Sequence, residues 1–348
     1  MMFPHDRKPY IIAEIGANHN GDMALARQMI DVAKECGADA VKFQSWDTTI
    51  FSHAVYEKNY FLGDDYRDRT DYTLRQIVEE FAVSFEDLKA LRSYCDEVGI
   101  DFSSTPFNEK QLDDLVALGA KYIKIASMDV TNPRLLRHAA QTGLPVILST
   151  GFAEMDEIDR AVRWLEEGGC AEIVLLHCVS LYPPEDDEVR LDNIDMLREV
   201  YGYPVGFSDH TTGTEIPIAA IAKRSVVIEK HYTLDRAMFG WDHHMSCTPE
   251  ELKAICTARD RIHPALGGKR RIVPERERTR RDEYRRSIVA ARPIAKGATV
   301  SPEDIDYRRP GTGLAPTMTD LVVGAVTRRE IAEDALIGLN DIVQPDDA

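Results

Sequence analysis

The sequence predicts a TIM (β/α)8 barrel followed by a small β-rich domain, and three observations support this fold class. First, short runs of strand-forming residues alternate with amphipathic helical segments up to about residue 265. Second, each run is apolar almost throughout, as expected for parallel strands that are covered on both faces. Third, eight such runs within roughly 250 residues match the strand number and size of a TIM barrel. A doubly wound open sheet is the structural alternative, but Ala17–Asn20 interrupts a Gly-rich dinucleotide motif after the first run.

The alternation also gives the expected elements in order. The strands are expected at Tyr10–Ile15, Ala40–Gln44, Asp101–Ser104, Tyr122–Ile125, Val146–Leu148, Ile173–Leu176, Pro204–Gly206 and Val226–Glu229. The helices are expected at Met23–Cys36, Ser84–Val98, Glu109–Leu118, Asn132–Gln141, Met155–Leu165, Thr214–Ala222 and Pro249–His263. Several helices are followed by glycine, as at Gly37 and Gly99, which is a common C-terminal stop signal.

A change of composition marks the expected domain boundaries, with a barrel over residues 1–266, a charged linker over 267–286 and a small domain over 287–348. The linker, GGKRRIVPERERTRRDEYRR, is dense in arginine and poor in apolar residues. It is either a solvated linker or a surface that docks on the acidic barrel or on a partner subunit. In the small domain we expect short strands at Ser287–Ala291, Ile305–Arg308 and Val322–Ala325. So small a domain has little core of its own, and we expect it to lean on the barrel.

The charge balance restricts the possible partners. The chain has 59 acidic and 42 basic residues, a formal net charge of −17. This argues against non-specific binding to nucleic acid or to an anionic membrane, and it requires a locally basic pocket for any anionic substrate. We find no signal-peptide pattern and no apolar run of membrane-spanning length, so we expect a soluble cytoplasmic protein. The six cysteines show no CxxC spacing and are interpreted as reduced thiols.

Polar residues stand at the C-terminal end of every expected barrel strand, where TIM barrels place their reacting groups. Single members of this ring have ordinary structural explanations, such as a hydrogen-bonded core histidine, so the argument depends on the ring as a whole. In strand order the ring consists of Glu14, Asn18 and His19; Lys42 and Gln44; Ser104 and Thr105; Lys124, Ser127 and Asp129; Ser149, Thr150 and Gly151; His177, Ser180 and Tyr182; Ser208, Asp209 and His210; and Glu229 and His231.

Lys42 and Lys124 lie within apolar strands, where an unpaired ammonium group would be costly. Together with nearby hydroxyl groups they indicate a pocket for a small phosphorylated and carboxylated anion. The hydroxyl groups are those of Thr105, Ser127, Ser149 and Ser208. A Schiff-base lysine is the competing interpretation, and two lysines within a ring of hydroxyls favour anion binding.

His210 and His231 end adjacent strands, so their imidazoles could reach one cation. Two imidazoles completed by water or substrate oxygens suit manganese, cobalt or zinc. His19, His243 and His244 are competing donors, and the spacing alone does not decide between them.

Several motifs resemble the sialic acid synthases, the family that makes N-acetylneuraminate, legionaminate and pseudaminate. They occur in order over nearly the whole chain: IIAEIGANHNGD, VKFQ, SSTPF, YIKIAS, ILSTG, LHCVSLYP, GFSDH, EKHYTLD and RRPGTG. The resemblance implies a TIM barrel with a C-terminal antifreeze-like domain, also called a SAF or β-clip domain. Val179 and Asp129 depart from the family pattern, and these changes bear on the identity of the sugar.

The resemblance also implies a role for each site residue. Phosphoenolpyruvate would be held by Lys42, Thr105, Lys124, Ser127, Ser149, Ser180 and Ser208, and a divalent metal would lie between His210 and His231. We expect manganese first, with cobalt, magnesium or zinc as alternatives. The sugar would contact Glu14, Gln44, Tyr182, Glu229 and Asp242, together with Arg309 from the other subunit of a domain-swapped homodimer. The candidate catalytic residues among them are Glu14, Glu229, Asp242 and Arg309, and either Glu14 or Glu229 could orient hydroxyls or move a proton.

The expected reaction joins phosphoenolpyruvate to an N-acetylated amino-sugar aldehyde, such as N-acetylmannosamine or a related acetamido or diacetamido hexose. It gives a sialic acid-type nonulosonate and phosphate, with cleavage of the C–O bond of phosphoenolpyruvate. Two other functions stay open from the sequence. One is a Schiff-base pyruvate aldolase that uses Lys124, and the other is a non-catalytic carbohydrate-binding protein.

Overall fold

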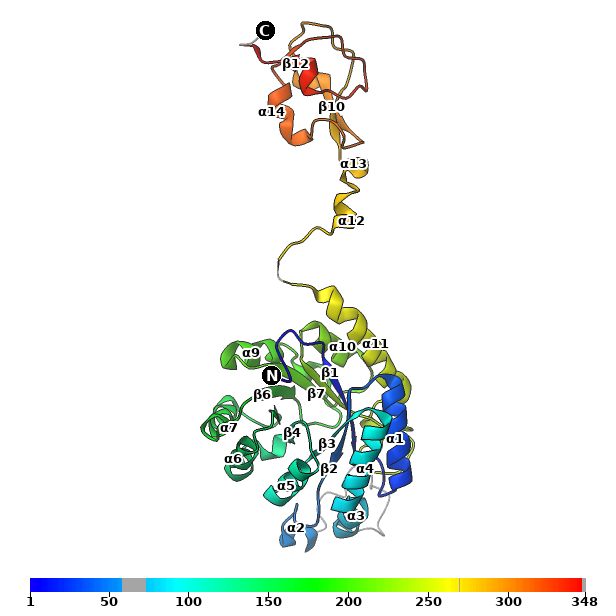
Figure 1. Cartoon of the computed structure of the whole chain (residues 1–348), viewed down its shortest axis with the longest axis vertical. Coiled ribbons are helices and arrows are strands. Elements are labelled where there is room, and N and C mark those ends of the chain that lie inside the picture. Colours follow the sequence, from blue (N-terminus) through cyan, green and yellow to red (C-terminus); the bar gives the residue numbers. More distant parts are fainter. Residues whose placement is uncertain (58–72, 269, 346–348) are drawn as a thin grey trace. The chain divides into compact units, whose positions relative to one another are not determined.

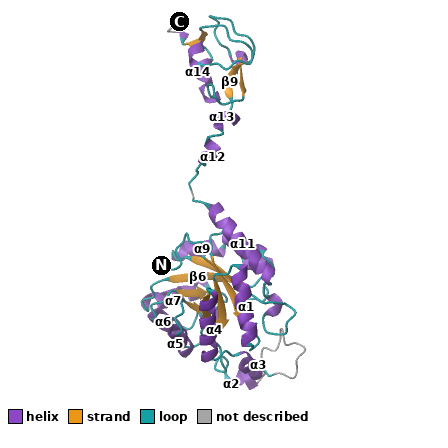
Figure 2. Cartoon of the chain, turned by 45° about the vertical axis from the view of Figure 1, so that its right-hand side comes forward, coloured by secondary structure: helices purple, strands orange, loops and turns teal. Residues whose placement is uncertain are grey.

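The computed structural model describes residues 1–57, 73–268 and 270–345. The chain divides into two compact units, Met1–Gly267 and Gly268–Ala348. The first unit contains a central parallel sheet surrounded by helices, and the second contains short strands and turns (Figures 1 and 2). Among the described residues, none of the helices combines the length and apolarity needed to span a membrane.

The first unit confirms the predicted TIM barrel. Its strands are β1 (Tyr10–Gly16), β2 (Ala40–Gln44), β3 (Asp101–Thr105), β4 (Ile123–Ile125), β5 (Val146–Ser149), β6 (Ile173–Cys178), β7 (Val205–Asp209) and β8 (Val227–His231). All of the strand pairings are parallel, in the order β3-β2-β1-β8-β7-β6-β5-β4. The two ends of this order, β3 and β4, contact each other, and this contact closes the sheet into a barrel. In the described residues, no hydrogen-bonded ladder joins these two strands.

The helices of this unit cover the outside of the sheet (Figure 2). They are α1 (Met23–Cys36), α2 (His53–Glu57), α3 (Leu74–Phe81), α4 (Phe85–Val98), α5 (Glu109–Ala117), α6 (Pro133–Gln141), α7 (Met155–Glu167), α8 (Asp186–Val189), α9 (Asn193–Tyr201), α10 (Glu215–Ala222) and α11 (Pro249–Leu266). Their apolar faces pack on the outward-facing strand residues in one large core, to which Ile11, Val41, Phe207 and Ile228 belong. Because side chains of a strand alternate between its two faces, the neighbouring residues point into the barrel.

The barrel interior is apolar at its N-terminal end and polar at its C-terminal end. Phe3, Tyr10 and Tyr122 form an edge-to-face cluster with centroids 5.5–6.1 Å apart, and Ile12 and Leu176 belong to the same small core. Two residues further along their strands, the inward positions that follow Ile12 and Tyr122 hold Glu14 and Lys124. The aromatic layer thus forms an apolar floor beneath a charged layer.

The main differences from the predicted elements lie at strand ends and in unpredicted helices. The strands β6, β7 and β8 each run two or three residues further than predicted, to Cys178, Asp209 and His231. These residues are polar or small. A prediction that follows runs of apolar residues therefore ends these strands too early. The helix α9 is missing from the prediction because it buries only Ile194 and Leu197, too few residues to give a clear helical period.

In the second unit the short elements surround a core of their own. They are β9 (Ser287–Ala290), β10 (Ile305–Arg308), α14 (Thr319–Val322), β11 (Val326–Thr327) and β12 (Ile342–Val343), with short 3-10 turns at Pro302–Asp304, Pro316–Met318 and Leu339–Asp341. The strands pair antiparallel, β9 with β10 and β11 with β12. The core includes Ile288, Val300, Ile331 and Ile337, all nearly inaccessible to solvent.

One strand predicted in this unit is wrong. Val322–Ala325 does not form a strand, because Val322 ends α14 and Gly324 adopts a left-handed turn with φ of 91°. The strand begins only at Val326. Glycine reaches this φ without strain, so Gly324 itself is the turn signal that the β-branched valines obscure.

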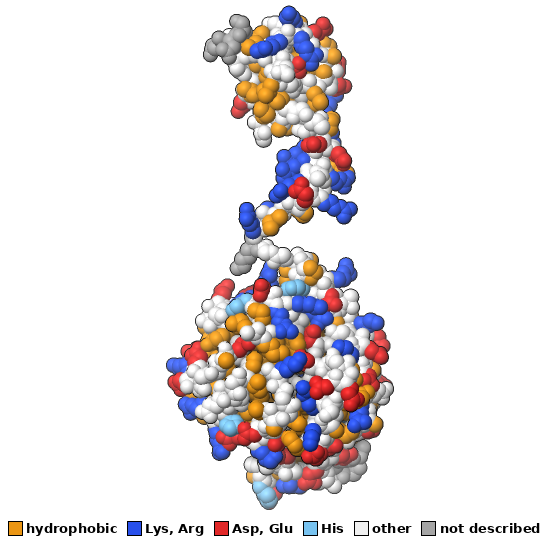
Figure 3. All heavy atoms as spheres, in the orientation of Figure 1, with side chains coloured by type: hydrophobic (Ala, Val, Ile, Leu, Met, Phe, Trp, Pro, Cys, Tyr) orange, Lys and Arg blue, Asp and Glu red, His pale blue; other side chains and the backbone are white. Residues whose placement is uncertain are grey.

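The arginine-rich segment predicted as a linker contains two short helices, α12 (Glu275–Arg278) and α13 (Arg281–Tyr284). Blue side chains gather over this part of the chain in Figure 3. The helices belong to the second unit, which begins at Gly268. Residue 269 lies outside the described residues.

Candidate functional site

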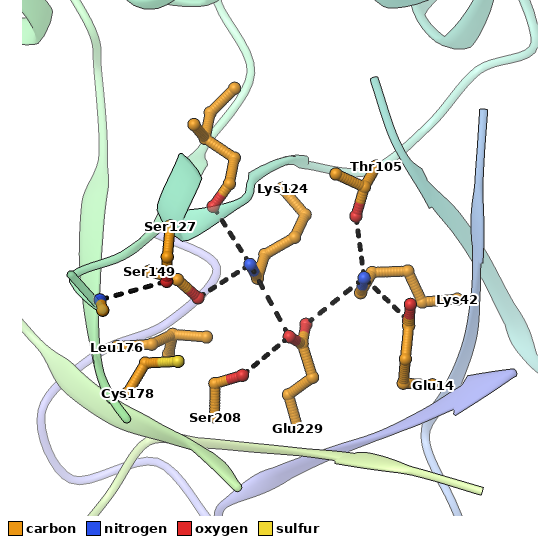
Figure 4. Close-up of polar contacts among 12 residues, drawn as sticks. Glu14, Lys42, Thr105, Lys124, Ser127, Ser149, Leu176, Cys178, Ser208 and Glu229 are labelled. Carbon is orange, nitrogen blue, oxygen red and sulfur yellow. Dashed lines mark hydrogen bonds and ion pairs between the residues drawn. The ribbon is translucent and has the colours of Figure 1, made fainter. Parts of the chain in front are cut away.

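The centre of the candidate site is a group of four buried charged side chains, Glu14, Lys42, Lys124 and Glu229. Lys42 Nζ lies 2.7 Å from Glu14 Oε2 and 3.8 Å from Glu229 Oε2. Lys124 Nζ lies 3.6 Å from Glu229 Oε1. Figure 4 shows the Glu229 carboxylate between the two ammonium groups. All four side chains point into the barrel, and each is at most 6% exposed.

Burial and the neighbouring charges change the pKa values of this charge quartet. Burial raises the pKa of Glu14 above its usual value, although Lys42 opposes the shift. Burial also acts on Glu229, but Lys124 and Lys42 outweigh it and hold the pKa of this carboxyl below its usual value. Glu229 therefore carries the firm negative charge, and Glu14 is the carboxyl of the quartet that more readily holds a proton.

The two lysines respond in opposite directions to the same surroundings. Burial would lower the pKa of Lys42, but its contacts with Glu14 and Glu229 outweigh burial and raise the pKa. Burial lowers the pKa of Lys124, whose carboxylate partner lies farther away. Lys42 is therefore the more firmly charged of the two ammonium groups.

The hydroxyl groups of Thr105 in β3, Ser149 in β5 and Ser208 in β7 line the same space (Figure 4). Lys42 donates to Thr105 Oγ1 at 2.7 Å, and Lys124 donates to Ser149 Oγ at 2.8 Å and to the backbone carbonyl of Ile125 at 3.0 Å. Ser208 donates to Glu229 Oε1 at 3.0 Å. These contacts bring the predicted anion-binding residues of β2, β3, β4, β5 and β7 together around Glu229.

Ser127 and Ser180 converge on the backbone at Gly151, after β5. The Gly151 N–H donates to Ser127 Oγ at 3.0 Å. A Cβ atom on Gly151 would lie 2.2 Å from Ser180 Oγ and 2.7 Å from Ser127 Oγ, closer than real contacts allow. Only glycine therefore leaves room for these two hydroxyls at position 151. The structure thus explains why Gly151 is a glycine, which the sequence alone did not.

The imidazoles of His210 and His231 lie side by side at the ends of β7 and β8, with ring centroids 5.4 Å apart. His210 Nδ1 is 2.8 Å from the backbone carbonyl of Val179, to which it donates, and this leaves Nε2 as the lone-pair nitrogen. His231 Nδ1 is buried without a hydrogen bond and lies 3.7 Å from Asp242 Oδ2. Burial holds the pKa of His231 well below its usual value, so His231 is neutral.

These histidines are suitable metal donors, yet they do not form a complete protein ligand set. Among the described residues, no three His, Cys, Asp or Glu side chains are gathered closely enough to hold a metal ion by themselves. The competing donors differ in surroundings: burial lowers the pKa values of His19 and His243 to about 4, and His243 is tied to other side chains. The orphaned Nδ1 of His231 beside a carboxylate fits a cation whose remaining ligands are water or substrate oxygens.

The remaining predicted barrel residues lie around this pair. Gln44 Nε2 donates to Glu14 Oε1 at 3.2 Å. The Tyr182 ring, 45% exposed, packs on His210 with centroids 4.2 Å apart. Together with Asp242, they would bring polar and aromatic groups to the side of the site that faces solvent.

Asp242 stands in a loop that His243 anchors, which gives this histidine a structural role. His243 Nδ1 lies 2.6 Å from Thr233 Oγ1, and its Nε2 lies 3.1 Å from Asn20 Oδ1. Asn18 donates to Ser246 Oγ at 2.9 Å, and Ser246 Oγ donates to the carbonyl of Asp242 at 2.6 Å. The loop after β8 is thereby fixed to the loop after β1.

Two features near the site were not singled out from the sequence. Cys178, at the end of β6, is buried with Sγ 4.0 Å from His210 Nδ1 and 3.8 Å from Ser180 Oγ. Beside it lies a cavity of about 440 Å³, lined by residues that include Thr150, His177, Cys178 and Ser180. The sequence contained the signal for Cys178, since it lies two positions after the inward-facing Leu176.

Arg309 belongs to the second unit, where its guanidinium carbon lies 5.4 Å from the ring centroid of Tyr284. Tyr284 also lines a hollow of about 400 Å³ with Arg271, Arg280 and Arg281. Arg309 thus stands beside a cluster of positive charge in its own unit.

Comparison with known proteins identifies both units. Residues 29–271 match the model of the NeuB family, and residues 285–343 match the model of the SAF domain. The chain is 38% identical to the N,N'-diacetyllegionaminic acid synthase of Legionella pneumophila, over 91% of this chain and 89% of the relative. It is 33% identical to the N-acetylneuraminate-9-phosphate synthase of Drosophila melanogaster, over 96% of each chain.

A solved structure agrees with these matches. The chain resembles the N-acetylneuraminic acid synthetase of Leptospira borgpetersenii, solved in complex with citrate, with a TM-score of 0.69 and 35% identity. The similarity covers 79% of this chain and 90% of that one.

The buried neutral His243 predicts a pH-dependent stability. Its pKa is lowered from 6.5 to about 4, so the unfolded chain takes up a proton first as the pH falls. Stability from this group is full above about pH 6.5 and is lost as the pH falls towards 4, by roughly 3 kcal/mol. His243→Gln should lack this loss. The difference in unfolding free energy between the variant and the wild type should therefore be smaller at acidic pH than at neutral pH. Denaturant midpoints at neutral and acidic pH measure this difference. The control is His263→Gln, which changes a partly exposed histidine. A constant difference at both pH values would contradict the prediction.

Proposed function

The chain belongs to the NeuB family, and we propose that it condenses phosphoenolpyruvate with the open-chain aldehyde of an N-acetylated amino sugar. The products are a sialic acid-type nonulosonate and inorganic phosphate. The observation that carries the proposal is the charge quartet with its surrounding hydroxyls at the C-terminal end of the barrel. It supplies ammonium groups and hydroxyl donors in a buried pocket, as a small dianionic or trianionic substrate requires.

In this proposal Lys42 and Lys124 hold the phosphate and carboxylate of phosphoenolpyruvate. Their present partners are Glu14 and Glu229, so an incoming anion shares these ammonium groups with two carboxyls. Thr105, Ser149 and Ser208 already bond to members of the quartet, and Ser127 and Ser180 offer further hydroxyls beside Gly151. In so buried a pocket, fixed charges and dipoles act strongly and need no rearrangement during the reaction.

The methylene carbon of phosphoenolpyruvate attacks the aldehyde carbon and forms the new C–C bond. Water then adds to the cationic C2, and phosphate leaves with the bridging oxygen. Glu14 is suited to hold or move a proton near the sugar, because burial raises its pKa towards neutrality. Gln44, Tyr182 and Asp242 would orient sugar hydroxyls around it.

We also propose that His210 and His231 hold a divalent cation, manganese before cobalt, magnesium or zinc. When bound, the cation would polarise the aldehyde oxygen as a Lewis acid. The backbone carbonyl of Val179 accepts from Nδ1–H of His210, so Nε2 is the nitrogen left for the cation, and burial keeps His231 neutral. Burial opposes the shift, but Cys178 raises the pKa of His210, so the cation would compete with a proton at this nitrogen.

A Schiff-base aldolase remains the second candidate, because burial lowers the pKa of Lys124 as a nucleophilic lysine requires. Against it, Lys124 Nζ already donates to Ser149 and to the Ile125 carbonyl and pairs with Glu229. A nucleophile would have to leave all three contacts, so the geometry favours anion binding.

The reaction itself is tested with phosphoenolpyruvate labelled with ¹⁸O at the bridging position and a panel of N-acetylated hexoses. We expect sugar-dependent phosphate release, with the label in the phosphate, because the C–O bond breaks. Release of unlabelled phosphate would contradict C–O cleavage. Covalent trapping of a lysine by borohydride with pyruvate, without phosphate release, would establish the aldolase instead.

Lys42→Ala and Lys124→Ala should each raise the KM for phosphoenolpyruvate by roughly 10- to 100-fold, because each removes a charged hydrogen-bond donor worth roughly 1.5–3 kcal/mol. Steady-state kinetics at saturating sugar measures the effect. Lys110→Ala, which removes an exposed lysine paired with Asp114 on α5, is the control and should change nothing. Unchanged KM values in both site variants would rule out this anion pocket.

Activity should depend on a divalent cation. Chelation should abolish turnover, and manganese or cobalt should restore it. The His210→Ala/His231→Ala variant should lose metal binding, whereas His138→Ala, which removes the histidine beside Asp113, should keep it. A double variant that binds the cation and turns over normally would show the assignment to be wrong.

We further propose a domain-swapped homodimer in which Arg309 completes the site of the other subunit and contacts the sugar. At a phosphoenolpyruvate concentration far below the raised KM of Lys124→Ala, the Lys124→Ala and Arg309→Ala dimers should each be nearly inactive. Exchange of their subunits should then restore activity, because one site of each heterodimer receives both intact residues. Lys124→Ala mixed with Lys42→Ala is the control and should stay inactive, since both lesions lie in barrels. Failure of the first mixture, or full activity of a diluted monomer, would contradict the exchange.

A further inference from the structure

A second buried ion pair lies at the ends of β7 and β8, outside the charge quartet. Lys230 Nζ is 2.6 Å from Asp209 Oδ2 and donates to the backbone carbonyl of Thr211 at 2.6 Å. The other oxygen of Asp209, Oδ1, accepts from the Thr211 N–H at 2.9 Å and from its hydroxyl at 2.8 Å. Asp209 and Lys230 are 1% and 2% exposed. The two Lys230 contacts therefore join β8 to the end of β7 and the turn after it, and the two Thr211 contacts close that turn on Asp209.

The position of this pair in the strands places it directly behind the two histidines. Asp209 and Lys230 are register partners, and each immediately precedes a histidine, His210 or His231. Because side chains alternate along a strand, the ion pair faces the helices while the flanking histidines face the interior. The inward contacts of Ser208 with Glu229, one position earlier, agree with this alternation.

Packing alone does not call for charges at this place. The side of the barrel that faces the helices is an apolar core, to which Phe207, Ile228, Tyr232 and Cys247 belong. Desolvating a buried ion pair often costs as much as the attraction returns, so apolar residues of similar size would serve stability equally well. The pair instead fixes the backbone around both histidines. Lys230, which precedes His231, holds Asp209 and the Thr211 carbonyl, which lie on the two sides of His210.

We propose that the Asp209–Lys230 ion pair positions the His210 and His231 imidazoles for one divalent cation. The inference rests on the proposed metal site. Asp209 and Lys230 are positioning residues, because they act through the strand ends and do not touch the cation. The pair fixes the turn at Asp209–Thr211, and the Val179 carbonyl fixes the ring that projects from it. Removal of a partner that is hydrogen-bonded to a metal-ligating histidine typically weakens metal affinity 10- to 100-fold, and we expect the lower end of this range for a pair that acts through the backbone.

The test measures the Kd of manganese for the metal-free full-length protein by calorimetry, with the melting temperature recorded for each variant. Lys230→Met should bind manganese at least about tenfold more weakly than the wild type. Its KM for phosphoenolpyruvate at saturating manganese should stay unchanged, because the charge quartet is intact. Asp209→Asn, which keeps an acceptor for Thr211 and removes the charge, should weaken binding in the same direction.

The control is Arg259→Met, which removes another buried cation, paired with Asp39, on helix α11. It should lower the melting temperature and leave the manganese Kd unchanged. Wild-type affinity in a folded Lys230→Met or Asp209→Asn variant would overturn the positioning role while leaving the metal site intact. Equal loss of affinity in Arg259→Met would also overturn it, since the effect would then follow from stability. A wild-type protein that binds no manganese would overturn the metal site and this inference together.

Discussion

Glu229 lies between the ammonium groups of Lys42 and Lys124, and this buried interaction sets the conditions for the rest of the site. Two lysines in a closed interior need negative partners, and Glu14 and Glu229 provide them before any substrate binds. The hydroxyls of Thr105, Ser149 and Ser208 each form a hydrogen bond with one of these charged groups. In the proposed function this pocket is preorganised for phosphoenolpyruvate, and that anion would meet four charges whose sum is close to zero.

The barrel supports this arrangement by separating two kinds of interior. Phe3, Tyr10 and Tyr122 close the N-terminal end with an aromatic floor, and the polar layer begins one inward position further along the strands. The lower layer keeps water from entering below, which preserves the strength of the charges above it. On the outer face, Asp209 and Lys230 connect the ends of β7 and β8, so the interior and exterior of the same strands serve different parts of the site.

Much of this could be predicted from the sequence, for reasons that concern particular residues. Apolar runs and helical periods gave the barrel and most of its elements, and Lys42 and Lys124 stood out because charge inside such runs is costly. Partners across the barrel could not be predicted: nothing in the sequence indicated that the carboxylate of Glu229, which is expected to contact the sugar, also lies between the two lysines. Lys230 was overlooked because its partner Asp209 lies 21 residues away, and only the register of β7 and β8 brings them together. The strand predicted at Val322–Ala325 was wrong because the valines favour a strand, and this preference obscured the turn signal of Gly324.

In the proposed function, the charge balance of the quartet governs the binding of phosphoenolpyruvate. An anion added to two lysines and two carboxyls leaves excess negative charge, which is relieved when Glu14, whose pKa is raised by burial, takes up a proton. Calorimetric titration of phosphoenolpyruvate in buffers of different ionisation enthalpy, at mildly alkaline pH, measures this uptake directly. We expect net proton uptake by the wild type and the loss of this uptake in Glu14→Gln. Equal proton exchange in both proteins, or none in the wild type, would contradict it.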